Sequence, residues 1–265
     1  MNRVVMIVGA SSGIGLAAAK KFIESGDIVY NCSRRKSPLE GIKNLTLDIV
    51  NTPDIRQRVE EIMENEKRLD IVVNCAGFSM AAPVEYVKSE DYRYLFDVNF
   101  FGAIELIKAV VPNMRPAGGK IILISSLGGV TPIPYDPYYS ASKAALNILA
   151  EALSFELEKQ NIYITSVMPG GTKTDFSFKR KIYKEEEVKQ YEDDFRNAVS
   201  SLQHIEQKGM PAEAVADTIL YVADLPNPPL IVASGIKNKI NNGLYKIMPR
   251  KVTHAITKMR YNLRP

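Results

Sequence analysis

Residues 4–15 read Val4-Val5-Met6-Ile7-Val8-Gly9-Ala10-Ser11-Ser12-Gly13-Ile14-Gly15, and this stretch decides the fold. Five consecutive apolar residues are typical of a strand buried on both faces, and the residues from Gly13 onward repeat with a helical period. The glycines permit a tight turn and a close approach of the backbone, while the helix N-terminus offers N–H groups to phosphates. The stretch predicts a nucleotide-binding strand, turn and helix, although a tight turn without a ligand has the same pattern.

The rest of the chain repeats this alternation of short apolar runs and longer helical segments. Patterns typical of strands cover residues 3–8, 27–33, 70–74, 120–125, 162–168 and 230–234, and helical patterns cover residues 13–25, 52–67, 89–115 and 139–159. Strands that alternate with helices form a parallel sheet covered on both faces, so we expect the α/β class. With 265 residues and no internal repeat, the chain predicts a single doubly wound Rossmann-type domain over residues 1–235.

Residues 171–210 interrupt the alternation. They lack a strand pattern and contain a charged, helical run, KEEEVKQYEDDFRNAV, at residues 184–199. We expect a substrate lid here, with Glu185-Glu186-Glu187 and Asp193-Asp194 on a solvated helix face. Five aromatic residues either line an apolar substrate pocket or anchor the lid to the body of the protein: Phe176, Phe178, Tyr183, Tyr191 and Phe195.

Residues 236–265 form a basic C-terminal extension. They contain eight Lys or Arg residues and no Asp or Glu. The last part predicts a helix that has Val252, Ala255, Ile256, Met259 and Leu263 near one face. Such a helix can pack on its own domain, pack across a dimer twofold, or bind peripherally to an anionic membrane. The basic residues lack the interleaved aromatic side chains and motifs of nucleic-acid binding, so we expect no nucleic-acid partner.

Composition and residue spacing limit the classes of protein to which the chain can belong. The formal net charge is +4, but 26 of the 34 basic residues and all 30 acidic residues lie outside the extension. Cys32 and Cys75 lie in or beside apolar runs, which favours reduced core residues, and His204 and His254 lack partners at ligand spacing, so we expect no metal site. Because the sequence has neither a signal-peptide core nor ~20 consecutive apolar residues, it predicts a cytoplasmic protein without a transmembrane segment.

The end of the second predicted strand indicates which dinucleotide is bound. NAD-preferring folds usually have an acidic residue there that binds the ribose 2′-hydroxyl. This chain has Ser33, Arg34 and Arg35 instead. A guanidinium group pairs with phosphate oxygens and stays charged, so these residues favour NADP(H), although two solvated loop arginines would give the same sequence.

A tyrosine, a lysine and a serine form the candidate catalytic group. Tyr139 and Lys143 are four residues apart on one face of a predicted helix, and Ser126 follows the strand KIILIS, at the sheet edge where such folds bind ligands. A phenol has an ordinary pKa near 10, and a nearby cation lowers it. Serine and tyrosine hydroxyls would supply hydrogen-bond donors where charge develops on a carbonyl oxygen.

Taken together with further motifs, these residues give the sequence a pattern that resembles the short-chain dehydrogenase/reductase family over about residues 2–235. The motifs occur in the family's order and at its spacing: Gly9-x3-Gly13-Ile14-Gly15, Asn74-Cys75-Ala76-Gly77, Asn99, Ser126, Tyr139-x3-Lys143 and Pro169-Gly170. Val8 replaces the family's usual threonine and Cys75 its usual second asparagine, which puts local hydrogen bonds in doubt rather than catalysis. The resemblance implies a homodimer or homotetramer.

The resemblance also implies roles for individual residues. Tyr139 would donate or accept the proton, Lys143 would lower its pKa and bind the nicotinamide ribose, Ser126 would bind the substrate oxygen, and Asn99 would support a proton relay. The remaining cofactor-binding residues would be Gly9, Ser11, Ser12, Gly13, Ile14, Gly15, Ser33, Arg34, Arg35, Asp48, Ile49, Asn74, Ala76, Gly77, Pro169, Gly170, Thr172 and Thr174.

The expected activity is therefore NADP(H)-dependent interconversion of a ketone and a secondary alcohol. An apolar segment at residues 127–135 and the lid favour a bulky lipophilic substrate such as a steroid, bile acid or keto lipid. The alternatives are a 3-ketoacyl thioester or small-ketone reductase, a non-catalytic NADP-sensing or scaffold protein, and a sugar-nucleotide epimerase or dehydratase. The complete catalytic group disfavours the scaffold, and the length and glycine pattern disfavour the epimerase. The sequence does not give the physiological direction of the reaction.

Overall fold

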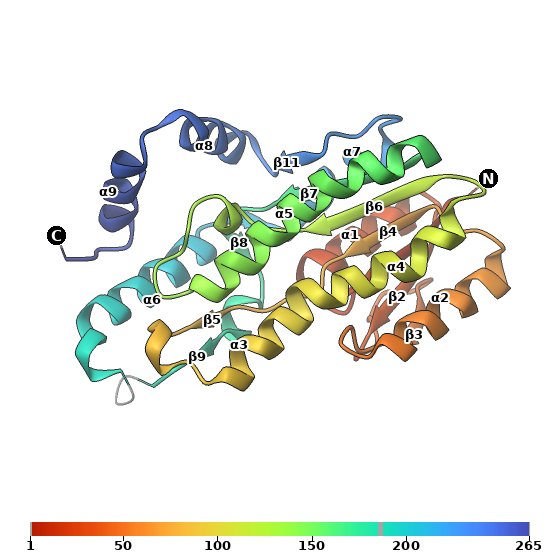
Figure 1. Cartoon of the computed structure of the whole chain (residues 1–265). Coiled ribbons are helices and arrows are strands. Elements are labelled where there is room, and N and C mark those ends of the chain that lie inside the picture. Colours follow the sequence, from red (N-terminus) through yellow and green to blue (C-terminus); the bar gives the residue numbers. More distant parts are fainter. Residues whose placement is uncertain (1, 185–187, 265) are drawn as a thin grey trace.

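The computed structural model describes residues 2–184 and 188–264, and a seven-stranded parallel sheet forms its centre (Figure 1). The strands stand in the order β11-β7-β6-β4-β1-β2-β3. Their bounds are β1 Val4–Val8, β2 Ile28–Ser33, β3 Lys43–Thr46, β4 Ile71–Asn74, β6 Gly119–Ile124, β7 Ile162–Met168 and β11 Ile231–Ala233. The chain runs from β1 to one edge and then from β4 to the other, so the strand order reverses between β1 and β4. The predicted doubly wound α/β fold is confirmed.

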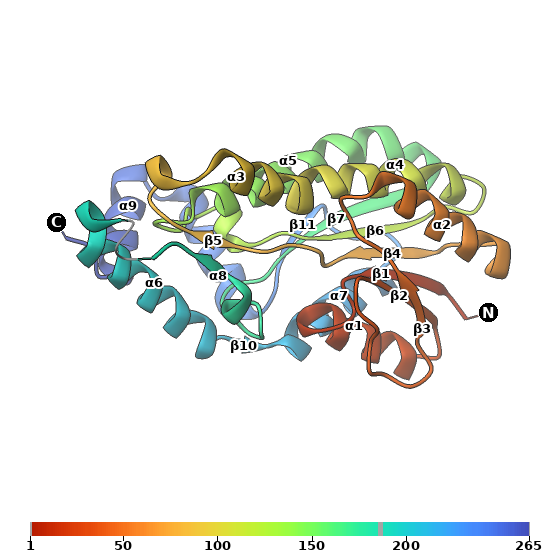
Figure 2. The same ribbon diagram turned by 90° about the horizontal axis from the view of Figure 1, so that it is seen from below.

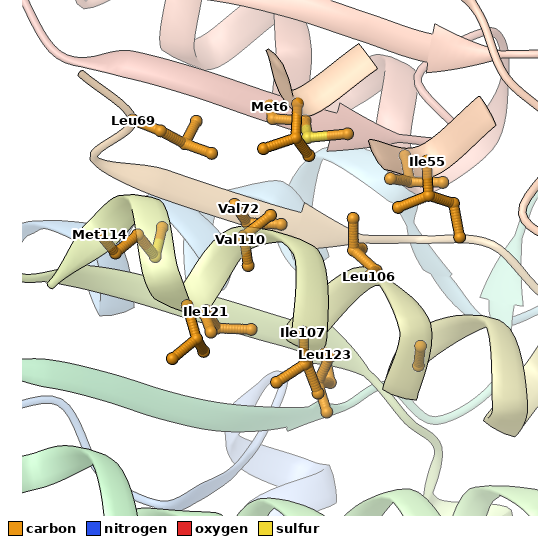
Figure 3. Close-up of a cluster of buried hydrophobic side chains, with 14 of the residues drawn as sticks. Met6, Ile55, Leu69, Val72, Leu106, Ile107, Val110, Met114, Ile121 and Leu123 are labelled. Atoms are coloured by element: carbon orange, nitrogen blue, oxygen red, sulfur yellow. The ribbon is translucent and has the colours of Figure 1, made fainter. Parts of the chain in front are cut away.

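Helices cover both faces of the sheet, as Figure 2 shows. One face packs against α2 (Thr52–Glu66), α4 (Gly102–Met114) and α5 (Pro137–Leu157), and the other against α1 (Gly13–Glu24) and α7 (Ala212–Asp224). In Figure 3, Met6, Val72 and Leu123 of the sheet lie with Leu106 and Val110 of α4 in one buried cluster. Because both faces are buried, the central strands are apolar throughout, which made them predictable.

Two elements of this core region depart from the predicted pattern. β3 is an additional edge strand whose four residues, Lys-Asn-Leu-Thr, are largely exposed and therefore lack an apolar run. The helix predicted over residues 89–115 is divided into α3 (Ser89–Phe96), a π-helical turn (Asp97–Phe101) and α4. A Cβ on Gly102 would lie 2.7 Å from Ile49, so glycine permits the close approach of α4 at this break.

The 171–210 segment contains short strands that the sequence analysis did not predict. β8 (Thr172–Lys173) pairs with β10 (Met210–Pro211), and β9 (Lys181–Ile182) pairs with β5 (Met80–Ala81). Strands of two residues have no periodic pattern. The expected helix is α6, but it spans Glu192–Gln207 and so begins well after residue 184. Glu185, Glu186 and Glu187 lie outside the described residues.

The C-terminal extension forms two helices, α8 (Ile236–Ile247) and α9 (Arg250–Arg260). The end of α9 contacts α6, where the Asn197 side chain donates to the Asn262 carbonyl at 3.1 Å and the Arg264 N–H donates to Asp194 at 3.1 Å. This shows packing on the same chain.

The apolar face predicted for the last helix agrees only in part with the face that packs against the protein. Thr253 and Tyr261 are buried, whereas Val252 and Met259 are exposed. Contacts with α6 set this orientation, and apolar periodicity did not predict it. In the described part of the chain, no helix is long and apolar enough to cross a bilayer.

Candidate active site

A cavity of about 740 Å³ opens at the carboxyl ends of the central strands. The loops that follow β1, β2, β4, β6 and β7 line it, because parallel strands end at one edge of the sheet. Every cofactor-binding or catalytic residue named from the sequence lines this cavity except Asn74 and Asn99. The fold thus brings together residues from position 9 to position 174.

Close packing fixes the glycine turn after β1. Gly9 has φ +93° and Gly13 has φ +58°, both in the region that favours glycine. A Cβ on Gly15 would lie 2.3 Å from the Gly9 carbonyl oxygen, so no other residue fits at the start of α1. The first turn of α1 therefore reaches the cavity as bare backbone, which suits a phosphate group beside the helix N-terminus.

Exposed cations surround this glycine-turn end of the cavity, which we define by Gly9–Gly15 and Ser33–Arg35. The Arg35 guanidinium and the Lys179 ammonium each donate to the Ser12 hydroxyl at 3.3 Å, and Arg34 is also exposed. Within residues 2–184 and 188–264, no carboxylate forms an ion pair with Arg34, Arg35 or Lys179. Cations that no carboxylate pairs with fit a dinucleotide with an additional phosphate.

Other residues named for the cofactor have partners within the protein. The buried Ser33 hydroxyl donates to Asn31 at 2.6 Å, and the buried Asn74 side chain accepts from the Ala76 N–H at 3.1 Å. Asn74 thus shapes the loop after β4 from outside the cavity. Lys179 was missed by the sequence analysis because it belongs to the 171–210 segment, whose path the local sequence does not determine.

Ser126, Tyr139 and Lys143 converge in the middle of the cavity. The Ser126 hydroxyl lies close enough to the Tyr139 phenol to act on its pKa, and the Lys143 Nζ lies 5.7 Å from the centre of the Tyr139 ring. The Lys143 Nζ also donates to the Ile124 carbonyl oxygen at 2.8 Å, which positions the ammonium. A Cβ on Gly129 would lie 2.7 Å from the Lys143 backbone, so the loop after β6 packs directly on α5 and holds Ser126 against Tyr139.

Burial shifts the pKa of both titratable members of this group. It raises the pKa of Tyr139 well above the ordinary value, and the Ser126 hydroxyl opposes that shift. It lowers the pKa of Lys143 to about 8. Both shifts disfavour the charged forms, as expected where water is excluded. To transfer its proton, Tyr139 would need further positive charge nearby that favours its phenolate form.

Asn99 lies behind this group rather than in the cavity. The residue is fully buried on the π-helical turn, and its side chain exchanges two hydrogen bonds of 2.9 Å with the Phe78 backbone. Its amide also donates to the Ser142 hydroxyl at 3.1 Å, which lies on α5 between Tyr139 and Lys143. Asn99 thereby joins the loop after β4 to the helix that carries the candidate catalytic residues.

The distal end of the cavity, which we define by Phe176, Arg180, Glu206, Asn242 and Tyr261, combines apolar and polar walls. The Phe176 ring lies 5.9 Å from that of Tyr139, and Ile133, Leu202 and Ile205 add aliphatic surface.

Phe176 alone of the five aromatic residues considered for the lid lines the cavity. Tyr183 and Phe195 are buried in the core cluster that also includes Tyr139, Tyr191 packs against Tyr135, and Phe178 is exposed, so the aromatic residues mostly anchor the segment.

A buried polar network accompanies the distal end. Arg180 pairs with Glu206 at 2.5 Å and donates to the Ser79 hydroxyl at 2.7 Å, and Ser79 in turn hydrogen-bonds to Asp136. Burial raises the pKa of Asp136 to about 7, although the hydrogen bond from Ser79 opposes the shift. Arg180 Nη1, Glu206 Oε2 and Asn242 Oδ1 are buried, and they find no hydrogen-bond partner among residues 2–184 and 188–264. Such groups are costly to leave unpaired, so they favour a bound polar group at this end.

Comparison with known proteins agrees with this geometry. A model of the short chain dehydrogenase family matches residues 3–185. A 3-ketodihydrosphingosine reductase of Bacteroides thetaiotaomicron is 36% identical over 230 residues, which cover 86% of each chain. An NADPH-dependent 3-dehydrocapnine reductase of Ornithobacterium rhinotracheale is 30% identical over 252 residues, covering 87% of this chain and 88% of that protein. A crystal structure of a short-chain dehydrogenase from Streptomyces avermitilis aligns with a TM-score of 0.82 and 26% identity over 97% of this chain and 96% of that one.

Proposed function

Because the chain belongs to the short-chain dehydrogenases, we propose that it is an NADP(H)-dependent oxidoreductase that interconverts the ketone and secondary-alcohol forms of a bulky lipophilic molecule. One observation carries the proposal. The hydroxyls of Ser126 and Tyr139 lie together in the cavity beside the buried Lys143 ammonium, between a cationic glycine turn and a distal end that combines apolar and polar walls.

Residues of the glycine-turn end would bind the dinucleotide. The N-terminus of α1 would take the pyrophosphate, and Arg34 and Arg35 the 2′-phosphate. Asp48 and Ile49 would lie at the adenine, while Ala76, Gly77, Pro169, Gly170, Thr172 and Thr174 would lie towards the nicotinamide. When bound, the nicotinamide supplies or accepts the hydride.

The three converging residues would serve the substrate oxygen. Ser126 and Tyr139 donate hydrogen bonds to the carbonyl oxygen, where negative charge develops as the carbon is reduced. Tyr139 then gives its proton to that oxygen, and Lys143 stabilises the phenolate that remains. Because burial raises the pKa of Tyr139, its phenolate form needs the nearby Lys143 cation. Asn99 hydrogen-bonds to Ser142 and so holds in position the helix that carries Tyr139 and Lys143.

The proposed substrate class is a keto lipid or a molecule of similar size, such as a steroid or bile acid. Phe176, Leu202 and Ile205 give the distal end an apolar wall. The reductases of Bacteroides and Ornithobacterium support this class by their names, and the second supports NADPH. We propose ketone reduction as the physiological direction, because cells keep the NADP pool reduced.

A second candidate is a 3-ketoacyl thioester or small-ketone reductase, which the same three residues would serve. The apolar wall of the cavity favours the larger substrate. A protein that senses NADP without catalysis would have no use for the Ser126–Tyr139 contact.

The test is NADPH oxidation with ketones graded in size, from a keto ester to steroid and long-chain keto lipids, with NADH in parallel. We expect catalytic efficiency to rise with apolar size and NADPH to be preferred. Tyr139→Phe should lower kcat by about a thousandfold or more while leaving NADPH affinity unchanged. Tyr138→Phe is the matched control, because Tyr138 stacks on Tyr92 at 5.1 Å outside the cavity. A keto ester turned over best would refute the substrate class, and tight NADPH binding without any turnover would favour sensing.

We also propose that the protein forms a homodimer or homotetramer and acts in the cytoplasm. Ile148 and Phe155 of α5 are 67% and 82% exposed and lie seven residues apart on one helix face, which suits burial against a second copy. Light scattering of wild type and of Phe155→Glu would measure the mass. A monomeric wild type would refute the oligomer.

A further inference from the structure

Helix α8 carries an aliphatic stripe on its solvent side. Ile236, Ile240, Leu244 and Ile247 are 78%, 57%, 45% and 79% exposed. At 100° per residue they fall within about 80° of one another around the helix axis. An amphipathic helix normally turns such a stripe towards the core, whereas α8 turns it away from its own protein.

The opposite side of α8 is polar and faces the cavity. Asn238, Asn241, Asn242 and Tyr245 line the cavity that contains Ser126 and Tyr139. The Asn238 amide donates to the Ser234 carbonyl at 2.8 Å and lies within 3 Å of the position of a Cβ on Gly170, so the helix is seated closely on the loop after β7. The polar side is therefore the side that packs. The aliphatic side remains available to a partner.

Positive charge flanks the stripe and continues into α9. Lys237 and Lys239 are exposed at the start of α8, and Arg250 and Lys251 are exposed at the start of α9. Val252 and Met259 of α9, 43% and 70% exposed, add apolar surface to this extension. Residues 236–265 contain no acidic residue. An apolar face flanked by cations matches the boundary between acyl chains and anionic headgroups.

We propose that α8, together with the exposed apolar residues of α9, docks on an anionic lipid bilayer. The aliphatic stripe enters the acyl boundary, and the flanking lysines and arginines contact the headgroups. A symmetric contact with a second copy through this face would place these cations opposite one another, which disfavours self-association as the use of the stripe.

Docking would place the cavity beside the bilayer. The helix that meets the lipid is the same helix whose asparagines line the cavity, so a lipophilic ketone would pass from the bilayer to Tyr139 with little exposure to water. This last step rests on the proposed function. The docking itself rests only on the exposed stripe and the charges.

The experiment is co-sedimentation of the full-length protein with vesicles of phosphatidylcholine, with and without phosphatidylglycerol. We expect binding to the anionic vesicles, weak binding to pure phosphatidylcholine, and release at high salt, because headgroup attraction is screened. Ile240→Glu/Ile247→Glu should weaken binding at least tenfold. Val84→Glu/Tyr221→Glu is the matched control, since it introduces the same charges at residues that are 62% and 57% exposed outside both the cavity and the extension.

Turnover of a water-soluble ketone and NADPH affinity are measured on the same samples, and neither should change in the Ile240→Glu/Ile247→Glu variant. Failure of the proposed function would thus be seen separately from failure of docking. Absence of binding to anionic vesicles, or equal loss in the control variant, overturns the proposal. Retained vesicle binding with a loss of dimer in light scattering would assign the stripe to self-association and also overturns it.

Discussion

The two ends of the cavity differ in how the sequence builds them. At the glycine-turn end, the residues of each loop are neighbours in the chain and follow a single strand, so local sequence determines their geometry. At the distal end, Arg180, Glu206 and Asn242 come from three separate segments and meet only in the folded protein. The first end presents backbone and exposed cations, and the second presents apolar surface with a buried ion pair. A site for a shared cofactor can be encoded locally, whereas a site for a particular substrate is assembled by tertiary contacts.

Ser126→Ala tests the place where the two ends meet and should have the largest effect after that of Tyr139→Phe. The variant removes one of two hydroxyls at the proposed position of the substrate oxygen, and loss of one such donor costs about a hundred- to a thousandfold in kcat. NADPH affinity should stay within about twofold, because Ser126 belongs to neither end. The measurements are steady-state NADPH oxidation and NADPH titration. Ser154→Ala, whose hydroxyl bonds only within α5, is the control. An unchanged kcat would remove Ser126 from the mechanism.

Glu206→Gln alters the distal end alone. It leaves the buried Arg180 guanidinium without its carboxylate, and breaking a buried pair from one side costs about 3 kcal/mol in the free energy of unfolding. Glu192→Gln on the same helix breaks an exposed pair with Arg196 and should cost less than about 0.5 kcal/mol. Urea unfolding measures both. We expect NADPH affinity to be unchanged in both variants, and a matching loss of affinity would show that the two ends are coupled.

This contrast also explains which features the sequence could predict. The glycine turn, the cations after β2 and the Ser126, Tyr139 and Lys143 set were all found from short motifs, and the structure places them in one cavity. Lys179, Arg180 and Asn242 carried no such motif, because their positions depend on the two-residue strands and on the packing of the extension. The family motif pointed to Asn99 as a residue of a proton relay, which stays a prediction, whereas its hydrogen bonds to Phe78 depend on the π-helical turn, which no periodic pattern encodes.

Arg34→Ala/Arg35→Ala alters the glycine-turn end alone. Charge-assisted hydrogen bonds to a phosphate contribute about 1.5–3 kcal/mol, so the KM for NADPH should rise about ten- to a hundred-and-fiftyfold while that for NADH changes little. Stability should not change, because both side chains are exposed. Lys36→Ala is the control, an exposed cation next in the chain that does not line the cavity. Equal losses for NADPH and NADH would refute the 2′-phosphate role.

Asp136→Asn tests whether the two ends respond differently to pH. A buried carboxyl accompanies the distal end, whereas the glycine-turn end depends on exposed cations. Burial raises the pKa of Asp136 from 3.8 to about 7, so between these values the folded protein keeps a proton that the unfolded chain releases. The stability that Asp136 contributes is therefore lost as the pH rises towards 7. From pH 5 to pH 8, the free energy of unfolding of Asp136→Asn should rise by about 2 kcal/mol relative to that of wild type. Urea unfolding at the two pH values measures this gain.

Asp91→Asn provides the opposite sign as a control. Hydrogen bonds from Lys181 and Tyr183 lower the pKa of Asp91, so its contribution is present at pH 8 and is lost only in acid as the pH falls through that lowered value. The free energy of unfolding of Asp91→Asn should therefore fall relative to that of wild type as the pH rises from acid. If Asp136→Asn shows no gain on wild type between pH 5 and pH 8, the carboxyl of Asp136 is already ionised in the folded protein near pH 5. A further buried charge would then lie beside the Arg180–Glu206 pair at the distal end, which would weaken the case for an apolar substrate.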